Sequence, residues 1–159
     1  MKRLIPIFLI LVLLCGCGNA VKEFDLSKEY GIKISLPKYC AVEEGAKENK
    51  FSLGTTFGTL EFRKYTDSEK DVSRETVELF IENSLNNKAV EIKELENGAF
   101  FFSEPPYGDQ EDPQYHTVEA YYFIQVEEII WRIHVISTNR MYNEAELLTA
   151  LQSIVFVNP

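Results

Sequence analysis

The chain has 159 residues, of which 45% are hydrophobic and 26% charged, and its formal net charge is −9 at pH 7. This composition is typical of one globular domain with a buried core, and it excludes a disordered chain and a collagen-like fibre. After the first twenty residues the apolar residues occur in short runs, which excludes a protein with several membrane spans.

The first sixteen residues have the organisation of a secretory signal peptide. Lys2 and Arg3 precede an uninterrupted apolar stretch at residues 4–14. As a helix this stretch is about 16 Å long, whereas a bilayer core is roughly 30 Å thick. We therefore predict a cleaved signal peptide at residues 1–16 rather than a stable membrane span.

The sequence Leu14-Cys15-Gly16-Cys17 resembles the lipobox of bacterial lipoproteins, in which the cysteine is acylated and the chain is cut before it. Cys17 fits this role because a small residue, Gly16, precedes it. Cys15 does not, because the bulky Leu14 lies next to the cut. We expect Cys17 to carry acyl chains such as palmitate, which hold the protein on the extracytoplasmic face of a bacterial membrane. The alternative is an ordinary secretory signal with two incidental cysteines.

Loss of the signal peptide leaves 14 basic and 25 acidic residues, a net charge of about −11. A domain this acidic is repelled by nucleic acid, so we expect no nucleic-acid partner. We assign residues 17–27 to the lipidated cysteine and a tether, and residues 28–159 to one domain. Cys40 is the remaining thiol, and we interpret it as a buried, inert residue rather than a nucleophile.

Alternating apolar and polar residues predict strands in the first half of the domain. The strongest strand covers residues 30–36. Its apolar face consists of Ile32, Ile34 and Leu36. Two further strands are predicted at residues 51–53 and 59–65, and the polar segment 41–49 is predicted to be a loop.

Two helices are predicted from apolar residues at helical spacing. The first covers about residues 74–85 with Ser73 as its N-cap. The second covers about residues 144–154, with Asn143 as its N-cap and Glu146 placed to form a capping box. The stripes expected to face the core are Val77, Phe80, Ile81 and Leu85 in the first helix, and Leu147, Leu148, Leu151 and Ile154 in the second.

One hairpin is predicted around Asn97-Gly98, the favoured pair for a type I′ turn, between strands at residues 89–95 and 99–103. Together with the other elements it makes an α+β domain. The economical arrangement is an antiparallel β-sheet with helices packed on its faces.

A longer hairpin is predicted between residues 117–124 and 129–137, with a short turn near Val126-Glu127. Pairing the strands symmetrically about this turn places Glu119 opposite His134 and Tyr121 opposite Arg132. Both faces of the hairpin are largely apolar. We therefore expect it to lie in the centre of the sheet, covered on both sides.

The order of these elements is similar to that of the Mog1/PsbP-like superfamily. The resemblance covers most of residues 28–157. It lies in the opening strand Tyr30–Pro37, the middle helix, the aromatic hairpin and the Leu-rich final helix that ends in Ile154-Val155-Phe156. Within the superfamily the nearer resemblance is to bacterial lipoproteins of the DcrB type. It implies an α/β/α sandwich and supplies no catalytic residues, since its members differ widely in function.

The histidines His116 and His134 are candidate catalytic or metal-binding residues. The predicted register places them on opposite faces, which disfavours a shared metal site. Glu119 and His134 have the residue types of an acid–base dyad and equally those of a cross-strand ion pair. Tyr121 opposite Arg132 predicts a cation–π contact. We expect no cofactor, since the sequence has no phosphate-binding glycine loop, nucleophile elbow or zinc-spaced Cys/His set.

The segment 103–115 is irregular, rich in proline and acidic. We interpret it as a loop that contacts a partner, with calcium binding as an alternative. The candidate contact residues are Tyr107, Asp109, Glu111, Asp112 and Tyr115.

These features favour a lipid-anchored extracytoplasmic protein that acts as a non-enzymatic binding or accessory module on another envelope protein. Two alternatives stay open. One is an extracytoplasmic hydrolase that uses Glu119 and His134, and the other is a small-ligand carrier with a pocket between the sheet and a helix.

Overall fold

The structure is a computed structural model, and it describes residues 21–37, 43–47, 50–55, 58–65, 72–85 and 90–157. The predicted signal peptide, Cys17 and Cys40 lie outside these residues. No helix within the described ranges is long and apolar enough to cross a membrane.

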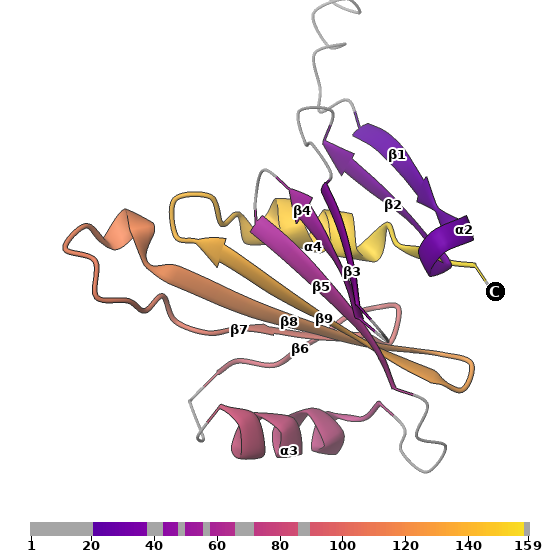
Figure 1. Cartoon of the computed structure of the whole chain (residues 1–159). Helices are drawn as coiled ribbons and strands as arrows, with labels where there is room; N and C mark the ends of the chain where they lie inside the picture. Colours follow the sequence, from indigo (N-terminus) through magenta and orange to yellow (C-terminus); the bar gives the residue numbers. More distant parts are fainter. Residues whose placement is uncertain are drawn as a thin grey trace, which may run out of the picture.

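Seven antiparallel strands form a large sheet in the order β3-β4-β5-β9-β8-β7-β6 (Figure 1). The strands are β3 (Glu43–Lys47), β4 (Lys50–Thr55), β5 (Gly58–Tyr65), β6 (Lys93–Glu94), β7 (Phe100–Ser103), β8 (Thr117–Val126) and β9 (Ile129–Thr138). The long hairpin β8–β9 lies in the centre of this order, which confirms the position predicted for it.

A second, three-stranded sheet has the order β1-β2-β10. It consists of β1 (Val21–Leu26), β2 (Ile32–Pro37) and β10 (Val155–Phe156), and the short helix α2 (Ser27–Tyr30) joins β1 to β2. The strand β1 pairs with β2 along its whole length. Most of the segment predicted as a tether, residues 17–27, is therefore part of the fold, and the domain begins no later than Val21 rather than at residue 28.

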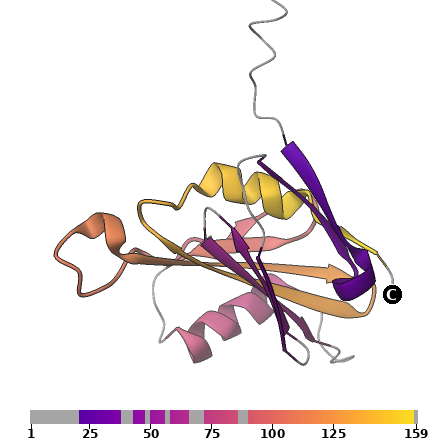
Figure 2. The same cartoon turned by 45° about the horizontal axis from the view of Figure 1, so that its top comes forward.

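Two helices pack on opposite faces of the large sheet (Figures 1 and 2). The helix α3 (Arg74–Ser84) begins after Ser73, whose hydroxyl accepts a hydrogen bond from the backbone N–H of Thr76. The helix α4 (Glu144–Gln152) begins after Asn143, whose side chain accepts from the backbone N–H of Glu146. Both predicted N-caps are confirmed.

The two faces of the sheet bury separate cores. The large core lies between the sheet, α4 and the second sheet. It includes Ile32, Ile34, Leu36, Phe62, Tyr122, Ile133, Leu147 and Leu151. The α3 core lies between the sheet and α3. It consists of Val77, Ile81, Leu85, Phe100, Phe102, Tyr121 and Phe123. Because alternate residues of β8 enter different cores, that strand is covered on both faces.

The hairpin register differs from the predicted one by two residues. The turn is Glu127-Glu128, with Glu127 at φ 56°, and the ladder pairs Glu119 with Ile136 and Tyr121 with His134. The predicted pairs of Glu119 with His134 and Tyr121 with Arg132 are therefore wrong. A shift of two residues keeps every side chain on its predicted face, because the side-chain period of a strand is two.

Two other local predictions are corrected. Residues 43–47, expected in a loop, form the edge strand β3. The first hairpin does not have a type I′ turn, since that turn needs positive φ at both central residues and Asn97 has none. Its loop is 96–98, with Gly98 at φ 77° and the backbone N–H of Leu95 donating to the carbonyl of Ala99.

Two glycines provide a matched test of the turn geometry. Gly58 has φ 132°, and a Cβ added there would lie 2.5 Å from the carbonyl oxygen of Ile136. Gly98 has φ 77° and no atom within 4 Å of the same added carbon. We expect Gly98→Ala to lower the free energy of unfolding by about 1 kcal/mol, and Gly58→Ala by roughly 2–4 kcal/mol because a backbone clash adds to the strain. Urea unfolding measures the free energy of unfolding of both variants. Equal losses in the two variants would contradict the close contact between Gly58 and the backbone of Ile136.

Candidate functional site

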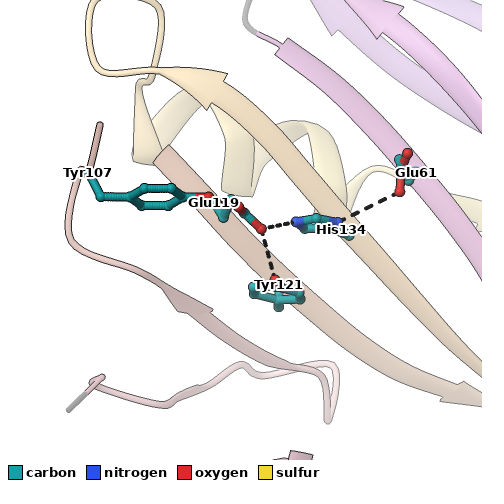
Figure 3. A network of polar contacts seen from close by, with 5 residues as sticks. All are labelled: Glu61, Tyr107, Glu119, Tyr121 and His134. Atoms are coloured by element: carbon teal, nitrogen blue, oxygen red, sulfur yellow. Dashed lines mark hydrogen bonds and ion pairs between the residues drawn. The ribbon is translucent and has the colours of Figure 1, made fainter. Parts of the chain in front are cut away.

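A cluster of five polar side chains lies on the α3 side of the large sheet and adjoins the aromatic residues of the α3 core, to which Tyr121 also belongs. Figure 3 shows the five side chains. The central strand β8 supplies Glu119 and Tyr121, and its neighbour β9 supplies His134. Glu61 comes from β5, and Tyr107 comes from the segment that precedes β8. We call this set the Glu119 cluster.

The carboxylate of Glu119 accepts hydrogen bonds from three sides. Its Oε2 lies 2.6 Å from Nε2 of His134 and accepts from the hydroxyl of Tyr121 at 3.0 Å. Its Oε1 accepts from the hydroxyl of Tyr107. The other imidazole nitrogen, Nδ1, lies 3.7 Å from Oε2 of Glu61. The imidazole therefore lies between two carboxylates (Figure 3).

The proton affinities of the cluster follow from these contacts. Burial raises the pKa of Glu119, but the hydrogen bonds from Tyr107, Tyr121 and His134 outweigh it, so the pKa is lowered overall. The bond to Glu119 raises the pKa of Tyr107 to about 12. Burial, followed by the same carboxylate, raises the pKa of Tyr121. Glu119 is therefore a stable anion and both phenols stay protonated donors.

The expected contact between Glu119 and His134 is thus confirmed, although the two residues lie diagonally across the ladder rather than opposite each other. Glu61 lies directly opposite His134 in the ladder of β5 and β9. The sequence alone did not reveal this neighbour, because nothing local identifies which strand pairs with the free edge of a hairpin.

This arrangement suits a structural ion-pair network better than acid–base catalysis. A catalytic imidazole needs one nitrogen oriented by a carboxylate and the other within reach of a substrate. In His134 one nitrogen contacts Glu119 and the other faces Glu61. The ring of Tyr121 stacks on the imidazole with centroids 4.5 Å apart and covers one of its faces.

The loop 104–116 contains the five predicted contact residues and projects beyond the end of the large sheet (Figures 1 and 2). At its base the backbones of Tyr107 and Thr117 exchange two hydrogen bonds. Near its tip Asp112 caps the 3₁₀ turn η2 (Pro113–Tyr115). The side chains of Tyr107 and Tyr115 are 43% and 48% exposed, so the loop is anchored at its base and presents two tyrosines.

His116 belongs to this loop, and its Nε2 lies 3.0 Å from the carbonyl oxygen of Gln110. The structure does not bring it together with His134. Within the described residues no group of three or more His, Cys, Asp or Glu side chains is placed to hold a metal ion, in the acidic loop or elsewhere.

A pocket of about 480 Å³ lies between α3 and the large sheet, where the carrier hypothesis requires one. Arg132 lines it. Its guanidinium carbon lies 5.6 Å from the ring centroid of Tyr65 and 5.2 Å from that of Phe80. The predicted cation–π contact of Arg132 thus exists with different aromatic partners.

Several solved structures have a similar fold, and two of them show the extent of the likeness. The Ran-binding protein Mog1p of Saccharomyces cerevisiae aligns with a TM-score of 0.57 at 11% identity, over 89% of this chain and 97% of the yeast chain. The cyanobacterial PsbP protein of Synechocystis aligns with a TM-score of 0.54 at 11% identity, over 89% and 95%. No protein-family model and no curated protein sequence matches the chain. The chain therefore has a Mog1/PsbP-like α+β fold, as expected, and at this identity the likeness extends to the fold alone.

Glu119→Gln tests the Glu119 cluster. The variant keeps the side-chain shape but removes the charge on which three hydrogen bonds converge. We expect it to lower the free energy of unfolding by about 1–3 kcal/mol at neutral pH. Because the pKa of Glu119 is lower in the folded protein, the charged carboxylate stabilises the fold at pH values above its ordinary pKa of 4.5. This stabilisation is lost as the pH falls through the pKa of the folded state. The difference from wild type should therefore shrink in acid.

Urea unfolding at neutral pH and at about pH 3 measures this difference. Glu82→Gln, at an exposed position of α3, is the matched control and should change the stability at neither pH. A loss that is the same at both pH values would show that the charge of Glu119 does not stabilise the cluster.

Proposed function

We propose that this protein is a lipid-anchored extracytoplasmic envelope protein that acts as a non-enzymatic binding module, with the loop 104–116 as its contact surface. The anchor rests on the signal peptide and on the lipobox-like sequence that ends at Cys17. The nearness to DcrB-type lipoproteins belongs to the same proposal. The observation that carries the binding role is a loop that projects from the fold and is nevertheless fixed at its base.

In this proposal the Glu119 cluster holds the base of the contact loop in place. Tyr107 belongs to the loop, and its hydroxyl donates to the carboxylate that also holds Tyr121 and His134. The cluster thus attaches the base of the loop to two central strands. A contact loop that is ordered before binding loses less conformational entropy on association, so each contact contributes more to affinity.

The chemistry of the loop specifies the partner surface. Asp109, Glu111 and Asp112 are exposed carboxylates, and Tyr115 is an exposed aromatic side chain beside them. Tyrosine is enriched at the energetic centres of interfaces, and an acidic rim favours a basic counterpart. The fitting partner is an envelope protein with an apolar groove bordered by Lys or Arg.

Cys17→Ala tests the anchor. The variant lacks the thiolate that takes the diacylglyceryl group, so we expect it to incorporate no fatty acid, whereas wild type becomes labelled. Metabolic labelling with an alkyne-tagged palmitate followed by mass spectrometry of the N-terminus measures this directly. Cys40→Ala is the matched control and should be labelled like wild type. Acylation of Cys17→Ala, or an unmodified wild-type chain, would overturn the anchor.

A photo-crosslinking amino acid in place of Tyr115 tests the contact loop in intact cells. We expect one discrete adduct with an envelope protein, and no such adduct when the same residue replaces Val155, which is exposed on the second sheet. The double substitution Asp109→Asn with Glu111→Gln should reduce the adduct severalfold. Glu82→Gln with Glu128→Gln removes the same charge elsewhere and should not. Equal adducts at both positions would contradict a specific loop interface.

A further inference from the structure

Arg132 is a partly buried arginine on the α3 side of the central strand β9. Its Nε is enclosed by protein and makes no hydrogen bond. Within the described residues no carboxylate forms an ion pair with its guanidinium, and its close contacts are the faces of the Tyr65 and Phe80 rings. Among the described residues, no side-chain or backbone oxygen accepts a hydrogen bond from this buried Nε.

The surroundings leave this positive charge incompletely compensated. Cation–π contacts offset part of the cost of burying a guanidinium, but they accept none of its in-plane N–H groups. Arg63 lies directly opposite Arg132 in the ladder of β5 and β9, and like charges at such positions repel. Burial lowers the pKa of Arg132 and Arg63 lowers it further, whereas Tyr65, Tyr121 and Glu61 raise it without reversing the downward shift. An anion that accepts from the outer Nη groups would offset both the burial of the charge and its repulsion by Arg63.

The space for such an anion is the pocket next to Arg132. Its volume of about 480 Å³ lies within the range of small-molecule sites, and most of its lining is apolar. The sheet contributes Phe123 and Ile130, and α3 contributes Phe80 and Leu79. Leu79 is 50% exposed, so it lies at the rim, where the pocket opens to solvent. A hydrocarbon chain between helix and sheet would bury this apolar surface.

We propose that the pocket beneath α3 binds an aliphatic carboxylate of the fatty-acid class, with its head group on Arg132 and its chain along the apolar walls. A planar carboxylate matches the fork of a single guanidinium and can accept two parallel hydrogen bonds. A phosphate monoester brings a second negative charge, for which the pocket supplies no second buried cation. A neutral apolar ligand would leave the guanidinium without an acceptor. The proposed ligand site is independent of the proposed function, because it uses neither the lipid at Cys17 nor the loop 104–116.

Binding of carbon-13 carboxyl-labelled decanoate tests the proposal. The full-length protein is reconstituted in phosphatidylcholine vesicles, and the carboxyl resonance and the bound amount are compared with those of vesicles that carry variants. Decyl phosphate and decanol serve as competing probes with the same chain. We expect decanoate to bind, decanol to compete roughly tenfold less well, and affinity to rise about fourfold per added methylene from octanoate to decanoate.

Arg132→Met and Leu79→Glu identify the two ends of the ligand. Arg132→Met removes the charge but keeps an apolar side chain of similar length. It should weaken decanoate binding roughly tenfold or more while the unliganded protein unfolds at the same or a higher temperature. Leu79→Glu places a hydrated charge on the apolar wall that contacts the chain, so it should weaken both decanoate and decanol. Val155→Glu makes the same change on the second sheet and should leave both unchanged.

Three results would overturn the proposal. Equal binding of decanoate and decanol would show that Arg132 does not recognise an anion. Tighter binding of decyl phosphate would assign the pocket to phosphate esters. Unchanged decanoate binding in Leu79→Glu would place the ligand elsewhere, and this variant decides the matter even if Arg132→Met fails to fold.

Discussion

The hairpin β8–β9 has no face suited to water, and the arrangement of the whole domain follows from covering it. Tyr121 and Phe123 of β8 require the helix α3 above them, while Ala120 and Tyr122 on the opposite face require α4 and the second sheet. Two separate cores result. Towards Glu119 the same sheet face becomes polar, and the side chains there hydrogen-bond to one another instead of burying hydrocarbon.

Periodicity within each segment was enough to predict α3 and α4 with their N-caps and buried faces, the strands β2, β4, β5 and β7, and the central position of the hairpin β8–β9. These properties depend on neighbours in the sequence. The strand β1 was not predicted, because its segment was assigned to a tether. The register was not predictable, because Glu127 takes a positive φ that the residue type does not favour and moves the turn by one position. The edge strand β3 was missed because its residues are polar, as edge strands commonly are.

The residues of the candidate site were likewise predictable only in part. Glu119 and His134 were identified from the sequence because they share a face of one hairpin, and a register error of two residues does not change that. Glu61 and Tyr107 come from a distant strand and from a loop, so only the three-dimensional structure joins them to the cluster. Arg132 was recognised as a partner for an aromatic ring, but its place in a pocket depends on α3, whose position no local pattern specifies.

The second sheet joins the first and the last strands that the structure describes. Val155 and Phe156 pair with Lys33 and Ile32, on the edge of β2 that β1 leaves open. That edge stays unpaired until β10, a segment far from β2 in the sequence, pairs with it. An open strand edge invites association with other chains. The pairing of β10 therefore closes an edge of β2 that would otherwise be exposed, and it couples the first strands of the described fold to its last one.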